Sequence, residues 1–566
     1  MGSLLTGKFT TMWEINAEAG REHPVFFAVY LAVLLAFVAA ALVLIWRQHA
    51  RGAFWCAVAA IVGAYFFSWG DDSFTHTYRI AALADQLRNG PLSAFLLSPS
   101  TGEGVPTFVY YSHVSYLLPV LFALLGLPAI WAFKISMMLY FVMMAAGVQA
   151  MVERSAPAKR DRGQLERDYL VALLFLGANY VYSLWFARGS LAEIWVYCLM
   201  PWVVASALSP VTGRWLAVFL FLQICGHPIV MAQCLVAEVI VAYSLSGLTP
   251  LQLVRRGLVP SVAAVVLSAP FWLPQGLWQG LILGPRALPA TFEESFVSLL
   301  DLVRFHHIRT VGIWMPLATI LVVVVARARL SLQFWVPAIV GFVLILLQAK
   351  PFYPITRLIP TLDLSIFVWR LALPAAVLLL GALLVGWREA GRSSRGLPVL
   401  ASLAVLGTAF VMLQFPGGVA KHLSWQDDRV AITEFEQLDG VWGVTEYLPQ
   451  YKNIPVECTT PDARRVSYRD LRNGVEARAR YIRVPQGPIG LVDYVADGTP
   501  IAVKACGDDL VLGPLAPTAH VIVSETRMDR LTLGRAIGFV AALILMLAVI
   551  PFVAWGGERR EAMLTM

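Results

Sequence analysis

The chain has 566 residues, of which 58% are hydrophobic and only 14% are charged, and its mean hydropathy is +0.69. This composition excludes an ordinary soluble globular protein and indicates a polytopic membrane protein. The net charge of +7 does not indicate nucleic-acid binding, because the Lys and Arg residues gather in short loops between apolar runs, as the positive-inside rule expects.

The first apolar run, residues 24–46, has about the ~20 residues that a membrane helix needs and no small-residue cleavage site after it. It therefore predicts a retained membrane helix. Arg47, His49 and Arg51 then indicate a cytoplasmic turn, and residues 54–67 return to the opposite face.

A polar stretch follows this second run and holds the strongest candidate residues. On a continuing helix, Asp72, His76 and Arg79 fall at i, i+4 and i+7, on one face. Charged groups at the edge of a membrane helix are costly to place, so they are often functional. Alternatively, Asp71 and Asp72 only end one helix and cap the next. A cap needs one acidic residue and no His–Arg ladder behind it, so we favour the functional interpretation.

Residues 70–108 are expected to form the first extracytoplasmic loop, with an interfacial amphipathic helix at 73–90. The basic residues at 153–168 belong in the cytoplasm by the charge rule, but two full crossings before them would place them outside. We therefore expect residues 109–127 to be a short or re-entrant helix on the outer side.

The apolar runs that follow alternate regularly and give about 12–13 spans in all. Residues 1–414 are thus expected to form a transmembrane module. Residues 415–530 carry more charge and period-two runs such as 477–484, which predict a small extracytoplasmic β-sandwich. Outside the cytoplasm, a Cys458–Cys506 disulfide is permitted. Residues 531–566 are expected to form a last membrane helix and a cytoplasmic tail.

Unusual polar residues fall on one predicted side of the membrane, whereas the other side carries mostly Lys and Arg. They are Asp71, Asp72, His76, Arg79, Glu103, Arg188, Glu193, His227, the segment 293–309, Arg357 and Arg370. Carboxylates can act as general bases, and arginines offer a planar charged fork to phosphate. The asymmetry indicates an outward-facing active cavity.

Several motifs resemble a known family when taken in chain order. Asp72-x3-His76-x2-Arg79-Ile80, Gly90, Gly102-x-Gly-x-Pro106 and Tyr110-Tyr111 resemble the first outer loop of GT-C superfamily glycosyltransferases. The chain is most similar to the bacterial membrane proteins called 6-pyruvoyl-tetrahydropterin-synthase-related. Further matches are the segments 188–193, 368–371 and 446–449, so the resemblance covers nearly the whole chain.

The resemblance implies a GT-C-like fold in the bacterial cytoplasmic membrane, with an active site facing the periplasm or exterior. It also implies an inverting transfer of a sugar from a polyprenyl-phosphate donor to a lipid, glycan or protein acceptor. Asp72 matches the family's catalytic aspartate, so it is expected to take the acceptor's proton. The family often shows one acidic residue here, so Asp71 remains an alternative base.

A lipid-phosphate leaving group needs its charge stabilised by cations. The sequence shows no dense metal-ligand spacing such as H-E-x-x-H, so arginines are favoured, with a divalent cation held by Asp72 and Glu193 as the alternative. The candidate substrate-binding residues are His76, Arg79, Tyr110, Arg188, Glu193, Arg357 and Arg370.

Each candidate has a simpler interpretation beside the functional one. Arg370 at a helix start could only extend its side chain to the interface, and Glu193 could pair with Arg188 and do nothing else. Tyr110 suits an aromatic belt better than sugar stacking. His227, between Gly and Pro, suits a turn residue, and His306–His307 suits a solvated loop.

Two other functions compete with the transferase. A transporter or flippase of a lipid-linked saccharide would place polar groups near the midplane on broken helices and often show repeats. The sequence shows neither. A non-catalytic scaffold for envelope assembly is the third hypothesis. Replacing Asp72 with Asn separates a transferase from both.

Overall fold

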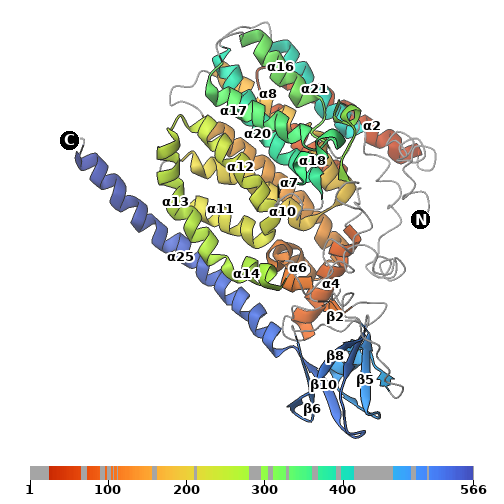
Figure 1. The fold of residues 1–566 in the computed structure, drawn as a ribbon. Helices are drawn as coiled ribbons and strands as arrows, with labels where there is room; N and C mark the ends of the chain where they lie inside the picture. The colour runs from red at the N-terminus through yellow and green to blue at the C-terminus, as the bar shows by residue number, and fades with distance from the viewer. Residues whose placement is uncertain are drawn as a thin grey trace.

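The computed structural model is mainly helical, with a small sheet region before the last helix (Figure 1). This confirms the predicted mainly α chain with β structure near its C-terminus. The structure describes residues 24–65, 73–89, 96–97, 104–105, 107–110, 112–155, 162–209, 213–278, 295–303, 310–326, 330–359, 367–390, 397–413, 463–485, 492–506 and 509–564.

The helical elements of the first half run in chain order with short connections. They are α2 (Pro24–Trp46), α3 (Ala50–Tyr65), α4 (Ser73–Asn89), α5 (Thr107–Tyr110), η1 (His113–Tyr116), α6 (Leu117–Leu124), α7 (Ala129–Arg154), α8 (Arg162–Leu176), α9 (Asn179–Tyr182), η2 (Ser183–Arg188), α10 (Leu191–Ala207), α11 (Gly213–Gly226), α12 (Pro228–Ser246), α13 (Pro250–Leu267) and α14 (Ala269–Trp278).

The second half continues the bundle and ends in a long helix. Its helical elements are α15 (Leu299–Val303), α16 (Trp314–Ala326), α17 (Leu332–Leu346), η7 (Lys350–Phe352), α18 (Tyr353–Thr356), η8 (Val368–Leu371), α20 (Ala372–Glu389), α21 (Leu397–Leu413), α24 (Tyr468–Asn473) and α25 (Thr526–Leu564).

Several of these helices have the length and composition of membrane spans. Among the described residues, five pass: Ala129–Arg154, Pro228–Ser246, Pro250–Leu267, Val368–Glu389 and Met528–Ala548. A sixth candidate is the pair Gly163–Leu176 and Asn179–Phe186, which is bent by 56° at its break. Further apolar helices, among them α10, α11, α16 and α17, have 10–17 residues. These helices are consistent with a membrane protein, and the count of twelve to thirteen spans stays a prediction.

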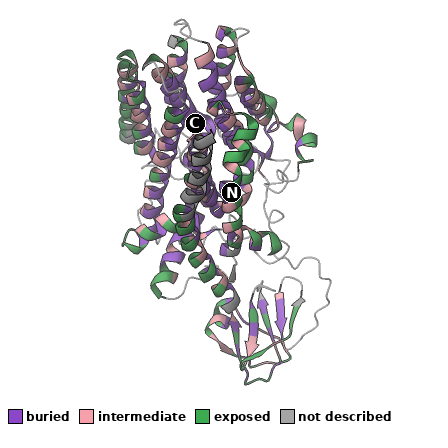
Figure 2. Cartoon of the chain, turned by 90° about the vertical axis from the view of Figure 1, so that its left-hand side faces the viewer, coloured by how far each residue is buried: buried purple, intermediate pink, exposed green. Residues whose placement is uncertain are grey.

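Helix α20 lies at the centre of the bundle. An 18-residue window within Val368–Glu389 is 100% buried, as expected for a helix that is apolar all round. It packs against α8, α12, α16 and α17. Gly386 permits this packing, because a Cβ there would lie 2.5 Å from Val322 Cγ1. By contrast, α13 and α25 expose rows of Leu, Ile and Val on the outside of the bundle, where Figure 2 shows exposed residues around a buried interior.

Contacts between distant segments define two ends of the bundle. At one, which we call the basic end, the turn between α2 and α3 meets α7 and α8: Arg51 pairs with Glu153 at 3.5 Å, and the Ala50 N–H donates to Glu166. The sequence placed both segments in the cytoplasm, and the structure puts them together. The opposite end, which we call the α4 end, contains α4 and lies next to the sheet region (Figure 1).

The segment after α5 is short, as expected. Helix α6 has 8 residues, far fewer than the ~20 needed to span a bilayer, and η1 before it has 4. Both pack beside α4 and α7. This arrangement explains how α7 can start at the α4 end and finish at the basic end.

The sheet region, which we define as residues 463–524, contains two four-stranded sheets. Their orders are β4-β10-β6-β7 and β3-β5-β9-β8, and β3 pairs with β5 in parallel while the other pairs are antiparallel. A short hairpin, β1 (Leu96–Leu97) and β2 (Gly104–Val105), precedes α5. The remaining strands are β3 (Ala463–Arg465), β4 (Val475–Glu476), β5 (Tyr481–Pro485), β6 (Asp493–Ala496), β7 (Thr499–Pro500), β8 (Val503–Cys506), β9 (Asp509–Leu512) and β10 (His520–Ser524).

One apolar core joins the two sheets through residues such as Tyr468, Ile482 and Val521. Two boundary predictions were wrong. The run 477–484 is not one strand, because β4 ends at Glu476 and β5 begins at Tyr481. The last helix begins at Thr526 and not after residue 530, because β10 leads almost directly into α25. The predicted disulfide lies outside the described residues, since Cys458 is not described.

Candidate functional site

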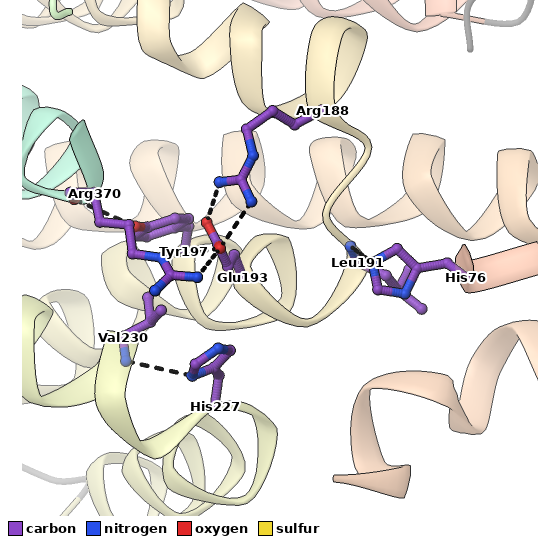
Figure 3. Close-up of polar contacts among 8 residues, drawn as sticks. All are labelled: His76, Arg188, Leu191, Glu193, Tyr197, His227, Val230 and Arg370. Atoms are coloured by element: carbon purple, nitrogen blue, oxygen red, sulfur yellow. Dashed lines mark hydrogen bonds and ion pairs between the residues drawn. The ribbon is translucent and has the colours of Figure 1, made fainter. Parts of the chain in front are cut away.

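Three predicted residues form one buried ion cluster at the α4 end: Arg188, Glu193 and Arg370 (Figure 3). Arg188 donates from Nη1 to Glu193 Oε2 at 2.8 Å and from Nη2 to Oε1 at 3.1 Å. Arg370 donates from Nε and Nη2 to Oε1 at 3.0 and 2.6 Å. The exposed fractions of the three side chains are 19% for Arg188, 1% for Glu193 and 10% for Arg370. Together they carry one net positive charge.

A broken helix presents Arg188 to the cluster. After the bend that follows α8, the chain continues through α9 into a π-helical turn, Ser183–Arg188. Gly189 then ends the turn at φ 66°, a left-handed conformation that glycine adopts without steric cost. Short π-helical turns are frequent at functional sites. Because the helix is interrupted here, Arg188 lies at the end of a helical segment and not in the middle of a continuous helix.

Glu193 lies in the first turn of α10, which begins at Leu191. The helix N-terminus carries a partial positive charge and favours a carboxylate. The fold therefore supplies both a helix end and two guanidinium groups to one buried acid.

Arg370 reaches the cluster from the 3₁₀ turn η8 that leads into α20. Its guanidinium lies over the ring of Phe367, 5.1 Å from the centroid, and the guanidinium of Arg188 lies 5.8 Å from the same ring. Phe367 also stacks on Trp369 at 4.4 Å. Tyr197 donates its hydroxyl to the Arg370 carbonyl at 3.3 Å. The hypothesis that Arg370 only extends towards the interface is therefore wrong.

His76 connects α4 to the start of α10. Its Nε2 accepts from the Leu191 N–H at 3.1 Å, so the ring proton is on Nδ1, which donates to Tyr116 Oη at 2.6 Å. Burial lowers the pKa of His76 well below its usual range; the charges of Arg79 and Arg188 act in the same direction, and Glu193 opposes them. His76 is thus a neutral side chain that connects two helices, and its Nε2 lone pair already accepts the hydrogen bond from Leu191.

Arg79 lies one turn after His76 and donates from Nη1 to the same Tyr116 hydroxyl at 3.2 Å. The prediction that His76 and Arg79 share a helix face is confirmed. Asp71 and Asp72 lie outside the described residues, but Asp72 is bonded to Ser73, the first residue of α4. Asp72 thus precedes His76 by four residues in the sequence, and its role as a base stays a prediction.

The other predicted residues are not brought into the cluster by the contacts that the structure describes. Arg357 is exposed, with its guanidinium 5.9 Å from the Tyr353 ring. Tyr110 ends α5, and its side chain lies outside the described part of the chain. Glu103, Glu293, Glu294 and His306–His307 are not described either.

His227 caps α12, as its turn-residue interpretation predicted. Its Nδ1 accepts from the Val230 N–H at 3.5 Å, and it lies beside the cluster (Figure 3). Gly226 before it fits under an indole ring, because a Cβ there would lie 2.2 Å from Trp195 Cδ1. A side chain at this position would push α11 away from α10.

Sequence reasoning missed Phe367, Tyr116 and Glu238. Phe367 stands directly before the matched Val368–Leu371 motif, so its position was a usable signal. Tyr116 had none, because its role depends on two elements that meet only in the fold. Glu238 lies within α12 and accepts from Gln223 Nε2 at 2.6 Å, and a carboxyl inside an apolar run was a visible signal that was overlooked.

In the described part of the chain, no group of three or more His, Cys, Asp or Glu residues is arranged to hold a metal ion. The alternative of a divalent cation bound through Asp72 and Glu193 conflicts with the ion cluster. A cation at Glu193 would approach two guanidinium groups and would have to displace at least one of them.

One surface hollow of about 350 Å³ lies on the sheet region and is lined by residues such as Arg464, Arg465 and Asp470. It does not include the ion cluster, and its lining combines these residues with Val466, Asn473, Gly474 and Val475. The cavity expected near residues 71–79 stays a prediction, because the segments on either side of α4 are not described.

Comparison with known proteins does not assign the chain to a family. A scan of the chain against models of protein families gives no match, and a search of curated protein sequences gives none either.

Proposed function

We propose that the chain is a GT-C-type glycosyltransferase of the bacterial cytoplasmic membrane. It transfers a sugar from a polyprenyl-phosphate donor to a lipid, glycan or protein acceptor outside the cytoplasm. The observation that carries the proposal is the convergence of Arg188 and Arg370 on Glu193, next to the helix that follows Asp72. In this proposal the sheet region is an extracytoplasmic β-sandwich.

The ion cluster suits a phosphate better than a neutral ligand. Guanidinium groups bind phosphate oxygens in a bidentate manner, and Glu193 fixes the planes of both groups before any ligand arrives. Pre-oriented donors stabilise developing charge without reorganising during the reaction. The cluster therefore supports binding of the donor's phosphate and stabilisation of the leaving group.

The proposed reaction uses Asp72 as its base. Asp72 removes the proton of the acceptor hydroxyl, and the acceptor oxygen forms a bond to the anomeric carbon. The bond between that carbon and the phosphate oxygen breaks on the opposite face, so the configuration inverts. Polyprenyl phosphate leaves with the bonding electrons, and Arg188 and Arg370 stabilise its negative charge.

The test uses the full chain in lipid nanodiscs with a panel of polyprenyl-phosphate hexoses, and it measures release of polyprenyl phosphate. We expect Asp72→Asn to lower turnover by roughly 10²–10⁴-fold, as for loss of a general base, while the affinity for polyprenyl phosphate stays unchanged. Asp71→Asn is the matched control and should retain turnover. The opposite result would identify Asp71 as the base. Full turnover in the doubly substituted chain would contradict the proposal.

A transporter or flippase of a lipid-linked saccharide remains the second candidate, because two observations favour it. The helix at α8–α9 is broken, and Glu238 and Gln223 form a buried polar pair within α12 and α11. Such features line the midplane sites of transporters. The test measures movement of a fluorescent polyprenyl-phosphate sugar across a vesicle membrane. If the chain is a transporter, Asp72→Asn should keep this transport and Glu238→Gln should abolish it. A scaffold would show neither activity.

A further inference from the structure

Arg535 joins the C-terminal helix to two segments far away in the sequence. It lies on α25 and is only 3% exposed. Its Nε donates to the Pro270 carbonyl of α14 at 2.8 Å, and its Nη1 donates to the Phe108 carbonyl of α5 at 2.6 Å. Helix α25 begins directly after β10 and runs along the flank of the bundle past α14 (Figure 1). The helix that carries the sheet region is therefore fixed to α5 by a charged side chain.

Phe108 connects this attachment point to aromatic residues at the α4 end. Its ring is fully buried, stacks on His113 at 4.3 Å and meets the ring of Tyr116 edge-on at 5.7 Å. Aromatic pairs in such geometries restrict one another's position. A shift of the α5 backbone would consequently move Tyr116.

Tyr116 is the point at which the chain of contacts reaches the ion cluster. Its hydroxyl accepts from His76 and Arg79, and His76 in turn accepts from the Leu191 N–H. That N–H belongs to the first turn of α10, where helical N–H groups have no partner within the helix. Glu193 stands in the same turn. The orientation of this turn sets where the carboxylate meets Arg188 and Arg370.

We propose that Arg535 is a positioning residue, which couples the sheet region to the Arg188–Glu193–Arg370 cluster through Phe108, Tyr116 and His76. Each step is a direct contact between buried groups, and the segments involved, α25, α5, η1, α4 and α10, are far apart in the sequence. The coupling stands on these contacts alone. Only its consequence for phosphate affinity rests on the proposed function.

The first experiment measures hydrogen exchange in the full chain in nanodiscs, in a peptide that contains the Leu191 amide. We expect Arg535→Gln to speed exchange of this amide by about 10-fold, because the local opening energy of the α10 start falls. Arg535→Lys keeps one donor and should show a smaller effect. The control is Arg388→Gln, which removes another buried arginine, with an exposed fraction of 15%, at the basic end. It should lower the unfolding temperature without changing exchange at Leu191.

A double-mutant cycle then tests the route. Arg535→Gln and Tyr116→Phe should have non-additive effects on Leu191 exchange, because both act through the same chain of contacts. Purely additive effects, or unchanged exchange in Arg535→Gln beside a lowered unfolding temperature, would overturn the proposal. Affinity for polyprenyl phosphate is measured on the same variants. Absent binding in the unmodified chain would contradict the proposed function but leave the exchange result interpretable.

Discussion

The bundle carries a buried arginine–carboxylate contact at each end, and the two differ in composition. At the basic end, one arginine meets one acid: Arg388 Nη2 lies 3.0 Å from Asp168 Oδ2, and Arg388 also donates to the carbonyl and the hydroxyl of Ser155 at 2.8 and 2.7 Å. At the α4 end, Arg188 and Arg370 share Glu193. The first contact joins one arginine to one carboxylate, and the second joins two arginines to one carboxylate.

Under the proposed function, this difference separates a contact that holds helices from one that binds an anionic ligand. At the basic end, the carbonyl and the hydroxyl of Ser155 accept further hydrogen bonds from the arginine that pairs with Asp168. Two guanidinium groups on one carboxylate repel each other, and an incoming anion relieves that repulsion. The same residue types therefore fasten α7, α8 and α20 at one end and support anion binding at the other.

The largest expected effect comes from removing the shared acid. Glu193→Gln removes the carboxylate that Arg188 and Arg370 share, so we expect a loss of about 3–5 kcal/mol of stability. Added inorganic phosphate should restore much of the lost thermal stability, because it replaces the missing charge. Asp168→Asn is the matched variant at the basic end, and phosphate should not restore it. Equal responses in differential scanning fluorimetry would show that the two ends do not differ.

A smaller effect is expected from replacing each arginine by lysine. Arg370→Lys removes the planar fork and a charge-assisted hydrogen bond, which corresponds to roughly a 10–100-fold loss of polyprenyl-phosphate affinity. Arg188→Lys should act in the same direction, whereas Arg388→Lys should leave affinity unchanged. Isothermal titration of the three variants gives the comparison. If only Arg388→Lys weakened polyprenyl-phosphate binding, the phosphate site would lie at the basic end and not at the α4 end.

The smallest effect is on pH dependence and concerns His76. Because its pKa is lowered in the folded chain, the unfolded chain binds a proton that the folded chain does not. The stabilising contribution of neutral His76 is complete above the usual value of 6.5 and is lost as pH falls below it. The slope for one proton is at most about 1.4 kcal/mol per pH unit. His76→Gln should remove this part of the dependence when unfolding is compared at pH 7.5 and 5, and an unchanged profile would show that His76 is not buried neutral.

Local patterns in the sequence predict much of the fold. The apolar runs correspond to helices, the His76–Arg79 spacing gives a shared face, and Arg188 and Glu193 are close enough in the chain to suggest their pairing. The sheet region was recognisable from its composition, but the period-two run 477–484 did not show that the strand begins only at Tyr481.

Contacts across the fold could not be predicted in the same way. Arg370 lies 177 residues after Glu193, and the sequence placed both on one side of the membrane without showing that their side chains meet. The bond between His76 and the Leu191 N–H depends on how α4 packs against the start of α10. The π-helical turn before Gly189 also has no sequence signal, because it arises from the way α9 fits between its neighbours.

Helix α20 and its preceding turn carry Arg370 near one end and Arg388 at the other. With a rise of 1.5 Å per residue, the 18 residue steps from Arg370 to Arg388 correspond to about 27 Å, close to the ~30 Å hydrocarbon thickness of a bilayer. The most deeply enclosed of the candidate spans in the described residues therefore sets the distance between two charged arginines near the two ends of the bundle. Lipids with much shorter or longer acyl chains would strain both ends at once.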